Sequence, residues 1–151
     1  MCSGLFPEDV MNNKQAGFSL IELLIAVTIV ALVMGFAVSA YQGQIQSSRR
    51  AEMQGQMMSL ATSLETWRSQ NFTYAGATVP VLAPDVAASN HYAVNIVLTN
   101  NNQSYELVAI PSGDMVGSGQ MRLDSQGRSC FNPASDTACD LADTNLRWGR
   151  K

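Results

Sequence analysis

The sequence predicts an α+β chain in which one long N-terminal helix packs on a four-stranded antiparallel sheet. Two observations indicate this fold class. No proline interrupts residues 18–71, whose apolar side chains are first continuous and then follow helical spacing. From residue 92 onward, short segments alternate apolar and polar residues and are separated by turn sequences. Because apolar residues make up 46% of the chain and charged residues 14%, a disordered chain is excluded.

The first part of the helix, residues 18–41, is an apolar run with a single charge, that of Glu22. About 24 helical residues are enough to cross roughly 30 Å of lipid hydrocarbon. The run is also longer than the apolar core of an ordinary signal peptide, which has about 7–15 residues. We therefore expect it to cross a membrane once.

The second part, residues 42–72, is predicted to be an amphipathic continuation of the same helix. Its apolar residues recur at steps of three and four, which places them on one helical face. These residues are Met53, Met57, Leu60, Leu64 and Trp67. This face is expected to pack on a globular head formed by residues 73–151, which begins with a loop containing Pro80 and Pro84.

The head is predicted to contain four strands in series. Residues 92–98 and 105–109 alternate apolar and polar side chains, and the sequence TNNNQ between them is typical of a hairpin turn. A third strand is predicted at 119–125, followed by the turn SQGR and a short fourth strand that contains Cys130. Short turns between strands indicate an antiparallel meander, and the tail from residue 132 is expected to be irregular.

Glu22 lies in the first turn of the predicted helix. One explanation is local, because SLIE matches a capping box in which Ser19 caps the helix and Glu22 bonds back to it. A carboxylate in a membrane costs on the order of 2–3 kcal/mol, however, and such acids usually have a function and a partner. A cut between Gly17 and Phe18 would give Phe18 a free ammonium group, which would pair with Glu22 of a neighbouring chain in a stack of staggered helices.

The sequence KQAGFSLIELLIAV closely resembles the cleavage and methylation signature of type IV pilins and type II secretion pseudopilins. The resemblance implies that a prepilin peptidase cuts after Gly17 and N-methylates Phe18. It also implies that Glu22 draws each subunit to the Phe18 terminus of its neighbour. Residues 41–76 are similar to the second half of the pilin helix, above all in minor pilins of the PilE type. The type IV pilin fold is therefore implied.

The resemblance also implies a role and a set of partners. A minor pilin is a structural subunit that waits in the inner membrane with its head in the periplasm. An inner-membrane assembly platform then builds it, with other major and minor pilins, into an extracellular fibre. Such a fibre serves twitching motility, adhesion or DNA uptake, and the sequence does not choose among these roles.

Residues 1–17 form the expected leader. Its acids, Glu8 and Asp9, make an unusual cytoplasmic flank, whereas a start at Met11 would leave the short leader MNNKQAG with one lysine. We therefore hypothesise that translation starts at Met11. This start would also remove Cys2 and leave an even pair of cysteines.

Cys130 and Cys139 are the two cysteines beyond the apolar run, and an exported head would place them where a disulfide persists. Pilins commonly join a cysteine near the third strand to one close to the C-terminus, so the resemblance implies a Cys130–Cys139 disulfide that closes a loop exposed on the fibre. The alternative is two unrelated buried thiols. A zinc site is disfavoured, because two cysteines and the distant His91 supply neither the ligands nor the spacing.

The remaining candidates give little indication of chemistry. His91 begins a strand without a carboxylate or nucleophile beside it in sequence, so we expect a surface residue. Trp148 lies beside Arg147, Arg150 and Lys151, which indicates either a tail docked on the head or a small basic and aromatic patch for DNA. A net charge of −3 and a pI near 4.9 give no support for DNA binding. No catalytic set, metal set or cofactor motif is found, so we predict no enzyme and no cofactor.

Two alternatives stay open. The first is a pseudopilin of type II secretion, although PASDTACDLADT lacks the acidic, glycine-rich calcium loop usual in major pseudopilins. The second is an exported periplasmic binding protein or enzyme, released by ordinary signal peptidase after the small residues that precede Tyr41.

Mass spectrometry of the mature protein from host membranes tests this interpretation. We expect a chain that begins with N-methyl-Phe18. A chain that begins at Tyr41 would instead show an exported domain, and would reduce Glu22 to a helix cap in a discarded signal.

Overall fold

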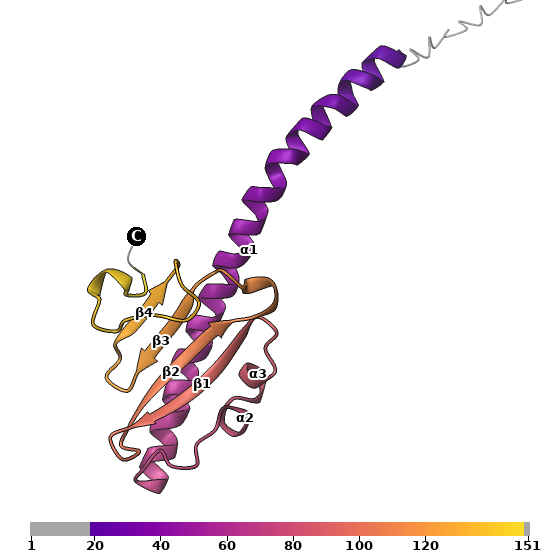
Figure 1. Ribbon diagram of the computed structural model, residues 1–151. Helices are drawn as coiled ribbons and strands as arrows, with labels where there is room; N and C mark the ends of the chain where they lie inside the picture. The colour runs from indigo at the N-terminus through magenta and orange to yellow at the C-terminus, as the bar shows by residue number, and fades with distance from the viewer. Residues whose placement is uncertain (1–18, 150–151) are drawn as a thin grey trace, which may run out of the picture. The chain divides into compact units, whose positions relative to one another are not determined.

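The computed structural model describes residues 19–149, apart from the side chains of residues 36–37 and 39–40. The chain divides into two compact units, residues 1–40 and 41–151. In the first unit, every described residue except Ser19 belongs to helix α1 (Leu20–Asn71). From Tyr41 onward, this helix is part of the second unit (Figure 1).

The second unit is the predicted head. Its elements after α1 follow in the order α2 (Val79–Leu82), α3 (Pro84–Ala87), β1 (Tyr92–Thr99), β2 (Ser104–Pro111), η1 (Gly113–Met115), β3 (Gln120–Asp124), β4 (Ser129–Asn132) and η2 (Thr144–Leu146). The segment predicted as a plain loop contains the single-turn helices α2 and α3. Pro80 and Pro84 lie in their first turns, where a proline loses no hydrogen bond and its fixed φ favours the helix.

The four strands form one antiparallel sheet in the order β1-β2-β3-β4, as predicted. In the first hairpin Tyr92 lies opposite Pro111 and Thr99 opposite Ser104. The turn between the strands holds Asn100, Asn101 and Asn102 at φ of 50°, 52° and 62°. Asparagine tolerates this left-handed conformation better than most residues, which is why TNNNQ can form the turn.

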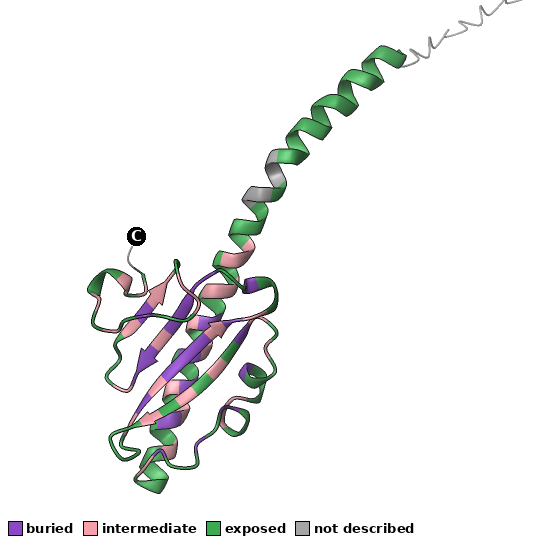
Figure 2. Cartoon of the chain, viewed as in Figure 1, coloured by how far each residue is buried: buried purple, intermediate pink, exposed green. Residues whose placement is uncertain are grey.

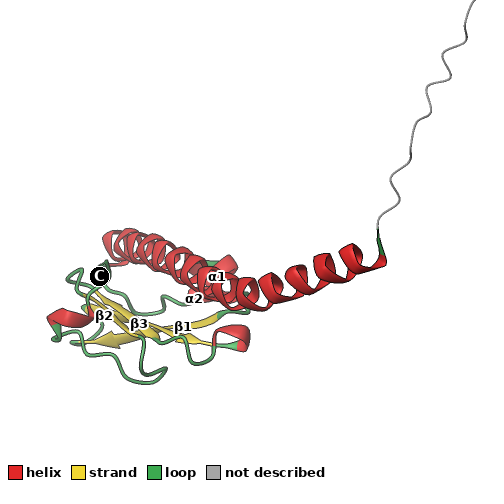
Figure 3. Ribbon diagram, turned by 90° about the horizontal axis from the view of Figure 1, so that it is seen from above, coloured by secondary structure: helices red, strands yellow, loops and turns green. Residues whose placement is uncertain are grey.

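The core lies between one face of α1 and one face of the sheet. Met53, Met57, Leu60 and Leu64 are buried, and Trp67 packs against them half-buried, as the helical spacing predicts. The sheet contributes Tyr105, Leu107, Ala109, Met121 and Leu123. Figure 2 shows buried residues along this contact, and Figure 3 shows the second part of α1 lying over one face of the sheet.

The C-terminal end of α1 is tied to the β1–β2 turn. The helix ends at Asn71. The amide of the next residue, Phe72, still donates to the Arg68 carbonyl at 2.7 Å, and its φ of 59° is left-handed. Immediately afterwards the Tyr74 amide and the Thr73 hydroxyl both donate to the Asn102 carbonyl, at 3.0 and 3.1 Å. The hairpin turn therefore fixes the direction in which the chain leaves the helix.

Truncation of a buried residue on the helix face tests the importance of this core. Leu64→Ala should lower the free energy of unfolding by about 2–5 kcal/mol, because the cavity left in a packed interface is filled only in part. Urea denaturation of the purified protein measures the change. Met58→Ala is the matched control: Met58 is 57% exposed on the same helix, and its truncation should cost under about 1 kcal/mol.

Candidate functional site

The predicted assembly segment begins outside the described residues, because Gly17 and Phe18 both precede Ser19. The cleavage site, the methylation site and the Met11 start therefore stay predictions. Glu22 occupies the first turn of α1, as expected, and is exposed. The helix starts with a bond from the Leu23 amide to the Ser19 carbonyl at 3.2 Å. A carboxylate in the first turn interacts favourably with the helix dipole.

The described apolar residues of the first unit have exposed side chains. The described residues include no helix that is both long and apolar enough to span a membrane. The membrane crossing by residues 18–41 stays a prediction.

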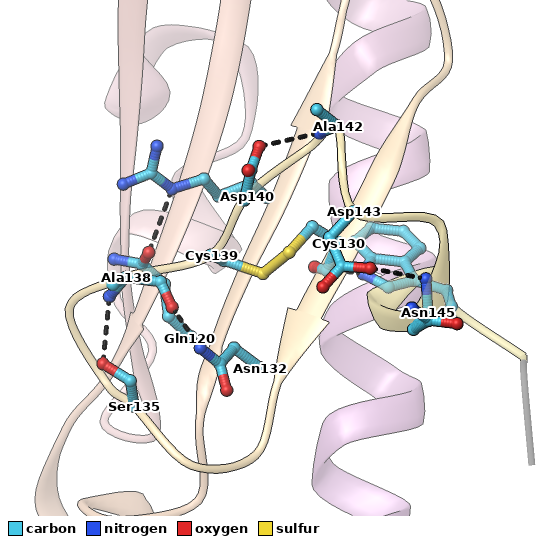
Figure 4. The surroundings of a disulfide bond; sticks show 12 residues. Gln120, Cys130, Asn132, Ser135, Ala138, Cys139, Asp140, Ala142, Asp143 and Asn145 are labelled. Atoms are coloured by element: carbon cyan, nitrogen blue, oxygen red, sulfur yellow. Dashed lines mark hydrogen bonds between the residues drawn. A yellow bond between two sulfur atoms is a disulfide. The ribbon is translucent and has the colours of Figure 1, made fainter.

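The predicted disulfide is present. Cys130 lies in β4 and Cys139 in the tail, their Cα atoms are 6.0 Å apart, and both residues are buried (Figure 4). This bond excludes the alternative of two unrelated thiols. It also leaves neither cysteine free as a zinc ligand.

The disulfide loop, residues 130–139, is held to the sheet by its own polar groups. The Asn132 side-chain amide donates to the Ala138 carbonyl across the loop at 2.6 Å. The Gln120 amide at the start of β3 donates to the Ser135 carbonyl at 2.9 Å. Figure 4 shows the disulfide, Asn132, Ser135 and Ala138 arranged around this loop. The loop is thus fastened at its two ends and near its middle.

Asp136 joins the disulfide loop to the β2–β3 connection by hydrogen bonds. Its two carboxylate oxygens accept the amides of Gly117 and Gly119, at 2.6 and 2.8 Å. Gly119 has a φ of 98°, and a Cβ there would collide with the Asn132 backbone, so glycine is required. The sequence indicated no partner for Asp136, because its partners are backbone amides 17 and 19 residues earlier.

The other tail acids are also bound to nearby backbone. Asp140 accepts the Ala142 amide and Asp143 the Asn145 amide, each at 2.8 Å (Figure 4). Residues 19–149 contain no group of three or more His, Cys, Asp or Glu side chains that could hold a metal ion. Each of the three acids in the sequence PASDTACDLADT therefore accepts hydrogen bonds from different backbone amides.

The tail ends on the head. The Trp148 indole nitrogen donates to the Cys130 carbonyl at 2.7 Å, and the ring packs half-buried against the core. This confirms the interpretation of a docked tail. Arg147 beside it is exposed, whereas Arg150 and Lys151 lie outside the described residues.

His91 has a partner that the sequence did not reveal. Its Nδ1 lies 2.7 Å from Oδ1 of Asp114 in the β2–β3 connection, and the two residues are 23 positions apart. The hydrogen bond to His91 lowers the pKa of the Asp114 carboxyl below its ordinary value. His91 is a partly exposed residue at the start of a strand, as predicted, and it also links that strand to η1.

Two buried tyrosines meet near the end of α1. The Tyr74 hydroxyl donates to Glu65 at 2.8 Å, and the Tyr74 ring meets the Tyr105 ring edge-on with centroids 4.9 Å apart. Burial raises the pKa of Tyr74, and the hydrogen bond to Glu65 raises it further. Burial and the charge of Glu65 raise the pKa of Tyr105 as well.

Most described arginines of the head are engaged within it. Arg122 pairs with Glu106 at 2.8 Å, and Arg128 pairs with Asp124 at 2.6 Å. The Arg50 guanidinium lies 4.2 Å from the centre of the Phe131 ring. The described surface therefore offers few arginines to an anionic ligand.

A long helix packed on a four-stranded antiparallel meander, with a C-terminal disulfide loop, defines the pilin class of fibre subunits. A family model described as "Type IV minor pilin ComP, DNA uptake sequence receptor" matches residues 39–130, and a model of the prokaryotic N-terminal methylation motif matches residues 12–38. The chain belongs to this type IV minor pilin family. Membership of this family agrees with what the N-terminal signature predicted.

Individual proteins are also similar. The chain is 32% identical over 92 residues to a type IV major alpha-pilin of Moraxella bovis, a match that covers 61% of this chain and 52% of that protein. The chain thus spans about half the length of the curated relative it matches. A solved structure of a type IV pilin from Shewanella oneidensis is 23% identical, with a TM-score of 0.47, over 63% of this chain and 97% of the other.

Loss of the disulfide tests how the loop is held. Replacing both Cys130 and Cys139 by serine should lower the free energy of unfolding by about 2–3 kcal/mol, because the unfolded chain regains the entropy of the open loop. It should also speed hydrogen exchange at Gly117 and Gly119, since the loop that carries Asp136 then keeps only its hydrogen bonds.

Asp136→Asn is the matched variant, because it weakens only the contacts to those two amides. It should speed exchange at Gly117 and Gly119 while the disulfide stays intact. If exchange at these amides were unchanged in both variants, Asp136 would not be what holds the β2–β3 connection.

Proposed function

We propose that the chain is processed and assembled as the N-terminal signature implies. The methylation-motif match over residues 12–38 supports cleavage after Gly17 and methylation of Phe18 by a prepilin peptidase. The segment beginning at Phe18 then anchors the subunit in the inner membrane, and Glu22 meets the Phe18 terminus of a neighbouring pilin during assembly by the inner-membrane platform. The head faces the periplasm before assembly and the exterior afterwards.

We further propose that this pilin serves DNA uptake, as a subunit that contacts DNA. The observation that carries this proposal is the family match, whose description names a DNA uptake sequence receptor and whose residues include β1, β2 and β3. Twitching motility and adhesion, the other roles of such fibres, have no comparable support.

The head's charges determine what kind of DNA binding is expected. The chain has a net charge of −3, and Arg122 and Arg128 are already paired with carboxylates. We therefore expect contact with only about two or three phosphates. Each neutralised phosphate contributes a slope of about −0.9 to the dependence of log affinity on log salt, so affinity should fall roughly 10- to 40-fold between 50 and 200 mM salt.

Deletion of the gene separates the candidate roles. We expect pili to remain on the cells while uptake of labelled DNA and transformation are lost. Normal uptake with defective twitching or adhesion would overturn the DNA proposal and leave the assignment as a minor pilin intact.

Binding of duplex DNA to the purified chain, measured by fluorescence anisotropy at several salt concentrations, gives the direct test. Arg147→Ala should weaken binding by about two- to fivefold and reduce the salt slope by about one, because Arg147 is exposed beside Trp148. Arg122→Gln is the control: its guanidinium is bound by Glu106, so the salt slope should not change.

A further inference from the structure

Strand β1 forms an edge of the sheet. The strand order β1-β2-β3-β4 gives it one partner, β2, and no strand of the described chain pairs with its other side. The helices α2 and α3 lie beside that side (Figure 1). Their backbone groups bond within their own turns, for example from the Ala83 amide to the Val79 carbonyl at 2.8 Å. The neighbouring helices therefore do not take the place of a strand.

The register shows which backbone groups face the open edge. The Ser112 amide donates to the His91 carbonyl at 2.9 Å, so residues 91 and 112 form a hydrogen-bonded pair of the antiparallel ladder. Such pairs recur at every second residue, which directs the backbone groups of Ala93, Asn95 and Val97 toward β2. The amides and carbonyls of the alternating residues Val94, Ile96 and Leu98 point away from β2.

The sequence of β1 lacks the residues that usually block pairing at an edge. The strand YAVNIVLT has neither a charge nor a proline over its eight residues, and it is rich in β-branched residues. Its exposed side chains include Val97, which is 45% exposed. Natural proteins commonly protect an open edge with lysine, proline or a bulge, and an uncharged edge of this length accepts another strand readily.

A groove of about 390 Å³ runs along the same edge. Ala93, Val94, Asn95 and Ile96 form one wall and residues 77–80 with Ala87 form the other. The lining contains no charged side chain, so it favours an uncharged occupant with small or branched side chains. The open amides and carbonyls of Val94 and Ile96 lie on the wall of this groove.

We propose that the β1 edge and its groove receive an extended, uncharged segment of a neighbouring pilin subunit, which adds a fifth strand to the sheet. This inference rests on the chain's membership of a fibre, where other pilins are its permanent neighbours. Main-chain bonds to Val94, Ile96 and Leu98 hold the added segment, and the uncharged groove selects its side chains.

A lysine in the groove tests the proposal in the full chain, expressed in its host. Asn95→Lys places a charge on an exposed groove residue without disturbing the buried face of β1, and should reduce incorporation into sheared fibres by more than about tenfold. Val81→Lys is the matched control: Val81 is 65% exposed on α2 but does not line the groove, and this variant should assemble normally. Equal melting temperatures of the purified proteins exclude misfolding.

Amide exchange gives a readout that does not depend on the substitution. In the purified subunit, the amides that face the open edge should exchange fast, and these are Val94, Ile96 and Leu98. The amides that face β2 should exchange slowly, and these are Ala93, Asn95 and Val97. In the fibre all six amides should be protected, and exchange at the three open-edge amides should be slowed more than about tenfold. Fast exchange at the three open residues in the fibre, or normal assembly of Asn95→Lys, would overturn the proposal. Protection that grows with concentration in the purified subunit alone would also overturn it, because two copies would then pair edge to edge.

Discussion

The contact between one face of α1 and one face of the sheet supports every other part of the head. A four-stranded sheet has too few strands to bury its own apolar face, so Met57, Leu60 and Leu64 supply the other half of the core. The same helix carries Glu22 and the described part of the methylation motif. The fold of the head and the predicted assembly segment therefore depend on a single continuous element.

The C-terminal third is organised by a second set of constraints, which act over short distances. The disulfide fixes the tail to β4, Asp136 extends from the loop to Gly117 and Gly119, and the Trp148 indole bonds back to β4. Polar groups carry these contacts because the segment contains few apolar residues that could build a core of their own. The head thus combines an apolar half built on α1 with a polar half built on a covalent loop.

The sequence was sufficient where periodicity determines the structure. The helical spacing from Met53 to Leu64 and the alternation around Leu107 gave the core, the strand order and the turns. It was insufficient where partners are distant along the chain, as with His91 and Asp114 or Asp136 and the amide of Gly119, because no local pattern encodes such pairs. The helical turns at the prolines escaped prediction because a single turn is too short to show a period.

The methionines of the head give the protein a graded sensitivity to oxidants. Four of the eight in the chain, Met53, Met57, Met115 and Met121, are buried in the core, whereas Met58 is 57% exposed. Oxidation to the sulfoxide makes a flexible apolar side chain polar, which a packed core does not accommodate. Met58 is therefore expected to react first, at little structural cost. Sulfoxide at the four buried methionines would indicate that the head had opened.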